Sequence, residues 1–421
     1  MDTSSGLSDR DALERFVADV REGKRSLRDL DQEGKPAAVS LRRHVLGTLT
    51  HTDLTPLTAT HVDAEHTLSN IENMFGSIEI PLGAAGPLLV KGQHARGLFF
   101  LPLATTEGAL VASVNRGCRA LTAAGGAITE TLQDAQARSL LFETADAESA
   151  RSFVSWLEQE ENRQVIFTVG QKGSRHLQLV GLEPFVRENH VWLRITAKTG
   201  DAMGMNMITI AGKQIGDYLE KKHPAVTFLS ESGNLCVDKK ASSLNQEKGR
   251  GKRVRAWAVL SSSIVEEVLK TTPEAMVRLN RLKNQEGSRL SGSLGENAHH
   301  ANMVAALFIA LGQDVAHTVD GSVGWTRMTQ EKDSLRVEVE LPALQVGTVG
   351  GGTGLPGQHA CLEMLGVAGG GHPEGSNGRK LGEIIAAGVL AGEISLMAAL
   401  STRMLAAAHQ RLNRNPVQPA P

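Results

Sequence analysis

The stretch from residue 140 to residue 230 breaks the pattern of the rest of the chain, and this break constrains the fold more than any other feature. It reads as a helix, strands, a second helix and an extended segment, in the order "ESARSFVSWLEQEE", "RQVIFTVG", "HLQLVGLEPFVREN", "HVWLRITAKTG", "DAMGMNMITIAGKQIGDYLE" and "AVTFLS". Strands with short connections favour antiparallel pairing and a compact α+β unit. We therefore predict a small domain at residues 140–230, inserted into a larger domain of residues 71–139 and 231–421.

The segments on either side of this unit predict helices. Residues 9 to about 50 carry apolar side chains at helical spacing, so we expect residues 1–70 to form a small N-terminal helical domain. "TEGALVASVNRGCRALTAAGG" is small, apolar and bounded by glycine, which indicates a tightly packed, buried helix. Further helices are expected at "SSIVEEVLKTTPEAMVRLNRLK", at "NAHHANMVAALFIALGQDVAHTV" and from Leu381 to about Leu412. With strands expected at residues 76–103 and in "SLRVEVELPAL", the fold class is α+β, with a helix-rich large domain around a buried central helix.

Length and composition limit the possible function classes. A chain of 421 residues fits two or three domains, and its net charge of −2 gives no reason to expect nucleic acid or an anionic membrane as a partner. Cys118, Cys236 and Cys361 are far apart and form no CxxC pair, which favours a reducing compartment. The polar N-terminus is unlike a signal peptide, and the longest apolar run, "MVAALFIALG", is shorter than the roughly 20 residues that span a bilayer. We therefore expect a soluble, cytoplasmic protein.

Four ionisable positions are candidates for chemistry. The loop "SGNLCVDKKASSLN" places Lys239 beside another lysine and an aspartate, which fits either a solvated loop or a site that needs these charges at one point. Glu107 stands alone in "PLATTEGALVASV", as a buried carboxylate that can carry a proton or as an acid stabilised at a helix start. Asp314 follows an apolar helical run and His409 lies near the end of the last expected helix; both also have an ordinary interpretation as polar residues at helix ends.

Other segments predict binding rather than catalysis. Arg116 and Arg119 lie three residues apart, hence on one helix face, and with Arg138 they could bind carboxylates or phosphates; a solvated basic face is the alternative. "TVGGGTGLPGQ" has GxGxxG spacing, but its proline and the lack of a βαβ pattern make it a weak dinucleotide signal. Its bare backbone could still let a phosphate approach. Adjacent His299 and His300 cannot both face one metal from a helix, so no metal site is expected.

The motifs occur together and in a fixed order: "ENMFGSIEIPLGAAGPL", "ATTEGALVASVNRGCRA", "DAMGMNM", "SGNLCVDKK", "EKGRGK", "NAHHANMVAALFIALGQD", "TVGGGTGL" and "LAGEISLMAAL". Over residues 10–414 the chain resembles 3-hydroxy-3-methylglutaryl-CoA (HMG-CoA) reductase, and its class I branch more than the NADH-linked bacterial class II branch. The resemblance implies the reduction of HMG-CoA to mevalonate and free CoA by two NADPH, in the mevalonate pathway of isoprenoid biosynthesis, without a metal. It also implies a homodimer or homotetramer with active sites at the dimer interface, a dimerisation motif at Glu72–Gly76, and no membrane anchor.

The resemblance assigns roles to individual residues. Those that match the catalytic positions are Glu107, Lys239, Asp314 and His409. Those that match positions holding the hydroxymethylglutaryl group are Arg138, Ser232, Asp238, Lys240 and Asn302. Those that match coenzyme A-binding positions are Ser113, Asn115, Arg116, Arg119 and Lys270. Those that match NADP-binding positions, in a family whose inserted ferredoxin-like domain carries NADP, are Ser174, Arg175, Asp201, Met203, Gly204, Met205, Asn206, Gly350, Gly351, Gly352 and Thr353.

These roles form a coherent chemical scheme. Each carbonyl reduction builds negative charge on an oxygen, which Lys239 would stabilise while Asp314 keeps Lys239 charged. Glu107 would donate a proton to the mevaldehyde oxygen, and His409 would protonate the departing CoA thiolate.

The chain departs from the family at "VAHTVDGSVGW", where Asp320 and Trp325 are unexpected, and it lacks a tyrosine near "GKRSLRDL". In "QKGSRHLQL", Arg175 with its neighbouring lysine and serine predicts a preference for NADPH, since no acid occurs in this segment. The alternatives are the reverse, catabolic reaction with NAD and a non-catalytic, regulatory paralogue.

Overall fold

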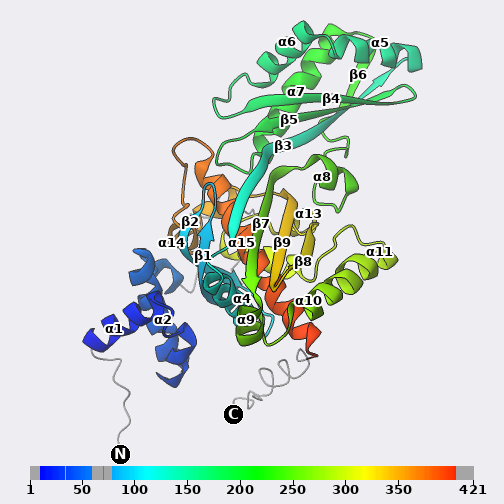
Figure 1. Cartoon of the computed structure of the whole chain (residues 1–421). Helices are drawn as coiled ribbons and strands as arrows, with labels where there is room; N and C mark the ends of the chain where they lie inside the picture. Colours follow the sequence, from blue (N-terminus) through cyan, green and yellow to red (C-terminus); the bar gives the residue numbers. More distant parts are fainter. Residues whose placement is uncertain (1–9, 34, 59–69, 71–77, 404–421) are drawn as a thin grey trace, which may run out of the picture.

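The computed structural model describes residues 10–33, 35–58, 70 and 78–403, and it is a mixed α/β structure (Figure 1). Two strands, β1 (Leu82–Lys91) and β2 (Arg96–Ala104), form a small antiparallel sheet. A seven-stranded sheet has the order β4-β5-β3-β7-β9-β8, and β6 also pairs with β3. Its strands are β3 (Ile128–Thr144), β4 (Gln178–Arg187), β5 (His190–Lys198), β6 (Val226–Ser230), β7 (Gly251–Ser261), β8 (Trp325–Glu331) and β9 (Ser334–Leu344).

Strand β3 connects two regions of the molecule. Its first half pairs with β7, and its second half pairs with β5 and β6. The sequence analysis did not predict β3, β7 or β8. Strand β3 could not be predicted because it contains the polar segment "TLQDAQARS", whose side chains form hydrogen bonds with residues distant in the sequence. Gln136 Nε2, for example, donates to Gln345 Oε1 over 2.7 Å and to the Met203 carbonyl over 2.9 Å.

Strands β4, β5, β3 and β6 carry helices α5 (Ala147–Leu157), α6 (Glu160–Gly170) and α7 (Met205–Lys222), seen together in the upper part of Figure 1. Their shared core contains Leu140, Phe142, Leu193, Ile195 and Ile208. One expectation was wrong, because "RQVIFTVG" lies in helix α6 and not in a strand. Ile166 is fully buried and lies one helical turn before Gly170, which packs against Leu179 and Ile215. These contacts override the preference of the β-branched residues for strands.

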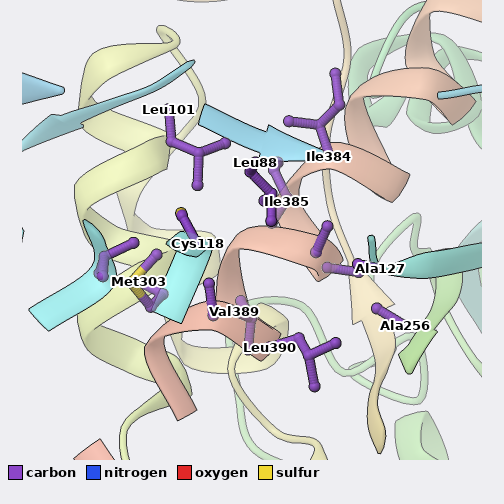
Figure 2. Packing of buried hydrophobic residues seen from close by; sticks show 14 of the residues in the cluster. Leu88, Leu101, Cys118, Ala127, Ala256, Met303, Ile384, Ile385, Val389 and Leu390 are labelled. Atoms are coloured by element: carbon purple, nitrogen blue, oxygen red, sulfur yellow. The ribbon is translucent and has the colours of Figure 1, made fainter. Parts of the chain in front are cut away.

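The largest core surrounds helix α15 (Ser376–Ser401), together with α4 (Leu110–Ala123) and α12 (His300–Ala310). Figure 2 shows side chains of α15 packed near Cys118 of α4 and Met303 of α12. At Gly117 a Cβ would stand 1.9 Å from the Ala391 carbonyl oxygen, so α4 and α15 touch backbone to backbone. Helix α4 is the buried helix expected from the sequence. Helix α15 is long and apolar enough to cross a membrane, but 83% of its most apolar window is buried inside the protein.

Near the N-terminus, α1 (Arg10–Arg21), η2 (Leu27–Glu33), α2 (Lys35–Thr50) and η3 (Thr55–Thr58) surround a separate small core. Phe16, Leu30 and Val45 form its centre, and it continues onto Phe100 of β2 and Met364. The helices expected in residues 9–50 are therefore present.

Two long helices expected from the sequence are interrupted. The first comprises α9 (Ser262–Ile264), η4 (Val265–Leu269), α10 (Pro273–Leu279), η5 (Asn280–Gly287) and α11 (Ser288–Ser291). Its break falls at Lys270, which has a left-handed φ of 61°. The second ends at Ala310, before Gly312 (φ 65°), which packs on Gly352. The remaining helices are α8 (Ser243–Lys248), η6 (Val315–His317), α13 (Thr318–Gly321), η7 (Gly351–Gly354) and α14 (Pro356–Met364).

Candidate active site

The loop between β6 and α8 carries Lys239 in a strained backbone conformation. Asn234, Val237 and Lys239 all have positive φ, of 65°, 51° and 55°. Such values are uncommon outside glycine and rare for a β-branched residue, so surrounding contacts must enforce them. The Gly233 amide donates to the Ser139 carbonyl over 2.6 Å, and Asn245 Nδ2 donates to the Val237 carbonyl over 3.1 Å. The loop therefore holds Lys239 in a fixed place.

Lys239 forms an ion pair with Asp314, although the two residues are far apart in the sequence. Lys239 Nζ lies 2.8 Å from Asp314 Oδ2, with 42% and 38% of the two side chains exposed. Asp314 begins η6, where Oδ1 accepts from the Ala316 amide over 3.1 Å. Burial alone would raise the pKa of Asp314, but the hydrogen bonds from Lys239 and Ala316, with His317 nearby, outweigh it and hold that pKa below its ordinary value.

A cavity of about 840 Å³ lies beside this loop. Its wall includes Ala241, two residues after Lys239, and Glu107, Lys283 and Asn302 from three other segments. Glu107 is exposed in the single chain, so the first of its two interpretations, a buried carboxylate, does not hold there. It precedes helix α4, which begins only at Leu110, so it stays outside the apolar interface of that helix.

Lys283 was not predicted as a site residue. It is half-buried in η5, where burial lowers the pKa of its ammonium while Glu393 acts in the opposite direction. Nothing in "NRLKNQEG" distinguishes it from a surface lysine, because only the three-dimensional arrangement brings it to the cavity.

Four residues predicted to bind substrate lie in or beside the Lys239 loop. Arg138 Nη1 of strand β3 lies 4.0 Å from Asp238 Oδ2, and Lys240 Nζ donates to the Asp238 carbonyl over 3.3 Å. Asp238 also accepts from Arg250 Nη2 over 2.8 Å, and Arg250 is fully buried. Ser232 lies at the start of the same loop. The sequence analysis missed Arg250 because "EKGRGK" reads as an ordinary basic turn.

Residues predicted to bind CoA divide into two groups. On α4, Ser113 Oγ lies 2.9 Å from Ser395 Oγ, and Arg116 donates to the Ser395 carbonyl over 2.6 Å. Asn115 Oδ1 accepts from the Gly86 amide over 3.0 Å. These three side chains therefore bind within the chain. Arg119 and Lys270, in contrast, are exposed.

The predicted nucleotide-binding residues lie on three loops. Ser174 and Arg175 line a surface pocket of about 630 Å³. Arg175 Nε donates to His176 Nε2 over 3.0 Å, and His176 Nδ1 lies 2.7 Å from Glu374 Oε1. The sequence analysis found no acid near this segment, yet the fold brings the Glu374 carboxylate to it from about two hundred residues away.

The other two nucleotide loops lie side by side, linked by a parallel bridge between Ala202 and Val349. Asp201 points inward: its carboxylate accepts from the amides of Gly371, Gly375 and Gly378, each over 2.8 Å. Met203 and Gly204 lead into helix α7, whose first two residues are Met205 and Asn206.

Gly350 and Gly351, with positive φ, have open space where a Cβ would stand, and Thr353 Oγ1 donates to the Gly350 carbonyl over 2.7 Å. The bare backbone of Gly350 and Gly351 leaves room for a dinucleotide to approach, so this part of the loop fits the cofactor, while Gly352 packs on Gly312 and Asp201 fits a structural role. His409 and Glu72–Gly76 lie outside the described residues.

Comparisons with known proteins identify the family of the chain. The family model described as "Hydroxymethylglutaryl-coenzyme A reductase" matches residues 38–414. The chain is 50% identical over 347 residues to the 3-hydroxy-3-methylglutaryl-coenzyme A reductase of Pyrococcus horikoshii, covering 82% of this chain and 84% of that one. It is 45% identical over 420 residues to the enzyme of that name from Aeropyrum pernix, covering 98% and 99%.

A solved structure gives the same fold. The class II reductase of Streptococcus pneumoniae bound to NADPH superposes with a TM-score of 0.66 at 18% identity, over 85% of this chain and 86% of that one. With a family match that spans most of its length, the chain belongs to the hydroxymethylglutaryl-coenzyme A reductase family.

Proposed function

We propose that this chain reduces HMG-CoA to mevalonate and free CoA with two NADPH, and that the reaction occurs in the cavity beside the Lys239 loop. The observation that carries the proposal is the Lys239–Asp314 ion pair of 2.8 Å, held next to a cavity that also presents Glu107, Lys283 and Asn302. The family supplies the substrate, and the residues of this chain supply the chemistry described below. The assignment to class I rests on the sequence motifs and stays a prediction.

Lys239 is placed to stabilise the oxygen on which negative charge develops. A fixed ammonium acts on that charge most strongly where its position is set before the reaction. The strained loop fixes the backbone of Lys239, and Asp314 holds the ammonium at 2.8 Å. Because Asp314 has a pKa below its ordinary value, it remains a carboxylate that can hold the Lys239 ammonium.

Proton transfer would come from two other groups. Glu107 on the cavity wall would protonate the mevaldehyde oxygen in the second reduction. His409 would protonate the CoA thiolate as it leaves, which prevents its return to the aldehyde. When bound, NADPH supplies the hydride for each reduction.

The substrate's carboxylate and hydroxyl would bind around Asp238 and Lys240, with Ser232 on the same loop. Arg138 and Asn302 approach from strand β3 and helix α12. Lys283 adds a cation to the cavity wall and is a further candidate for binding the carboxylate. For coenzyme A, the exposed Arg119 and Lys270 are the candidates for its phosphates.

Residues 140–230 would form the ferredoxin-like NADP-binding domain. Their sheet order, β4-β5-β3-β6, and the sequence of strands and helices support this part of the proposal. Ser174 and Arg175 would bind the 2′-phosphate of NADPH, and the open backbone of Gly350 and Gly351 would face the dinucleotide. Asp201 would hold the Gly371–Gly378 segment in place rather than contact the cofactor.

We further propose a cytoplasmic homo-oligomer whose active sites lie between subunits. In the single chain Glu107, Lys239 and Asp314 are all exposed, so the candidate site is open to solvent on one side. Ile78, 92% exposed, adds an apolar surface just after the dimerisation motif predicted at Glu72–Gly76.

The test is a spectrophotometric assay of the purified protein with HMG-CoA and either NADPH or NADH. We expect the absorbance of reduced nicotinamide to fall quickly with NADPH and slowly with NADH. Faster NAD reduction in the presence of mevalonate and CoA would indicate the catabolic reaction. The absence of any reaction would indicate a non-catalytic paralogue.

A further inference from the structure

A buried histidine stands among the carboxylates that surround the Lys239 loop. The His317 side chain is 0% exposed. Its Nδ1 lies 3.1 Å from Asp320 Oδ1, and its Nε2 lies 3.7 Å from Asp238 Oδ1 and 3.9 Å from Asp314 Oδ2. Both ring nitrogens therefore face carboxylates, which come from the Lys239 loop and from the η6–α13 segment. This cluster also contains Asp320, which departs from the family pattern in the sequence.

Each of the three carboxylates has a cation on another side. The pairs are Lys239 Nζ with Asp314 Oδ2 (2.8 Å), Arg250 Nη1 with Asp320 Oδ2 (2.9 Å), Arg250 Nη2 with Asp238 Oδ1 (2.8 Å) and Arg138 Nη1 with Asp238 Oδ2 (4.0 Å). Asp320 is 1% exposed and Arg250 is 0% exposed, so this part of the network is hidden from solvent. The cations neutralise the carboxylates individually, while among the described residues only His317 lies near all three.

The positions of the ring protons follow from these distances. His317 Nε2 is buried and has no hydrogen-bond partner among the residues that the structure describes. A neutral ring with its proton on Nδ1 would set the Nε2 lone pair against Asp238 and Asp314. A neutral ring with its proton on Nε2 would set the Nδ1 lone pair against Asp320. Only the doubly protonated ring presents an N–H to acceptors on both sides.

We propose that His317 is a positioning residue, which as an imidazolium holds the carboxylates of Asp238 and Asp314 in one fixed arrangement beside Lys239. This inference rests on the proposed function, which gives Asp238 a role in substrate binding and Asp314 a role in catalysis. Burial would raise the pKa of Asp314. The hydrogen bond from Lys239 and the charge of His317 lower it. Asp320 and Arg250 orient the ring from the side away from Lys239.

The kinetic test uses His317→Gln, which keeps a side-chain N–H but cannot carry a charge. Mevaldehyde serves as the substrate, because its reduction expels no thiolate and so does not depend on His409. An opposite charge within 4–6 Å lowers an aspartate pKa by about 1–3 units, so its loss should move the acid limb of the kcat profile to higher pH by about one pH unit. Loss of a group that orients a catalytic residue typically lowers activity by about 10–100-fold.

The matched control is His190→Gln. His190 Nε2 also lies near a carboxylate, 3.3 Å from Glu143 Oε1, but on strand β5, away from the Lys239 loop. This variant should keep the wild-type rate and pH profile. A wild-type profile in His317→Gln as well would overturn the proposal.

Nitrogen NMR of histidine-labelled protein tests the protonation state without any assay of activity. At neutral pH both ring nitrogens of wild-type His317 should resonate in the imidazolium range. In Asp320→Asn the ring should become neutral at a lower pH than in the wild type. A neutral wild-type ring would overturn the proposal even if His317→Gln fails to fold. If the wild type reduces neither HMG-CoA nor mevaldehyde, the proposed function fails, while the NMR result still decides the state of His317.

Discussion

Replacing Lys239 with methionine separates the catalytic contribution of the Lys239–Asp314 pair from its contribution to folding. Methionine keeps the unbranched stem and removes the ammonium. Because 42% of the Lys239 side chain and 38% of the Asp314 side chain are exposed, water screens the pair. Exposed pairs contribute about 0.2–1 kcal/mol to the free energy of unfolding, so the variant should remain folded with little loss of stability.

The catalytic effect of the same substitution should be far larger. Loss of one donor to a developing oxyanion lowers kcat by about 10²–10³, which corresponds to about 2.7–4 kcal/mol of barrier. The assay is NADPH oxidation with HMG-CoA and with mevaldehyde, since both reductions build charge on oxygen. Urea unfolding followed by circular dichroism measures the stability of the same samples.

Lys213→Met is the matched control, because it removes a lysine whose Nζ lies 2.6 Å from Asp217 Oδ2 on the exposed side of helix α7. This variant should keep both its activity and its unfolding curve. Near-normal turnover of Lys239→Met would contradict the catalytic role of Lys239. So would a loss of activity that is fully explained by unfolding of the variant.

Three further substitutions test other parts of the site. Arg250→Met should lower the free energy of unfolding by about 3–5 kcal/mol in urea titrations, because it removes the buried guanidinium that pairs with Asp320 and Asp238 and leaves only His317 beside the buried Asp320; a loss under about 1 kcal/mol would contradict this. Asp314 has a pKa below its ordinary value of 3.8, so its contribution to stability is present above pH 3.8 and is lost as the pH falls through the lowered pKa. Asp314→Asn should flatten this part of the curve of unfolding free energy against pH. An unchanged curve would contradict the ion pair. Arg175→Ala should raise KM for NADPH by about 10–100-fold through the loss of a charge-assisted hydrogen bond, while KM for NADH stays unchanged; equal damage to both would remove Arg175 from the 2′-phosphate site.

The sequence predicted those elements whose pattern is local. Helix α4 carries small and apolar residues bounded by glycine, and strands β4, β5 and β9 have the composition of half-buried strands, so each was found. Strand β3 was missed because its polar residues are satisfied only by partners distant in the chain, such as Gln345 for Gln136. The segment "RQVIFTVG" was assigned to a strand because its β-branched residues favour one, although the packing of Ile166 and Gly170 makes it helical.

For the site, the sequence and its family resemblance supplied candidate residues and the expectation that Asp314 acts on Lys239, but not the other contacts. The motifs identified Lys239 and Asp314, and the fold brings them within 2.8 Å. Their support could not be predicted, since Arg250 and His317 look ordinary in their own segments. Glu374 is distant from Arg175 in the sequence and comes close to the Arg175 loop only in the folded protein. The sequence therefore did not predict an acid near the proposed phosphate site.

The proposed function requires two successive reductions at one site, and the ratio of NADPH oxidised to CoA thiol released measures them together. Purified protein is incubated with limiting HMG-CoA, the nicotinamide absorbance is followed to its end point, and the thiol is then titrated. The proposed function predicts two NADPH for each CoA, with mevalonate as the product. A ratio of one, with an aldehyde as the product, would contradict the proposed function, and so would CoA release without NADPH oxidation.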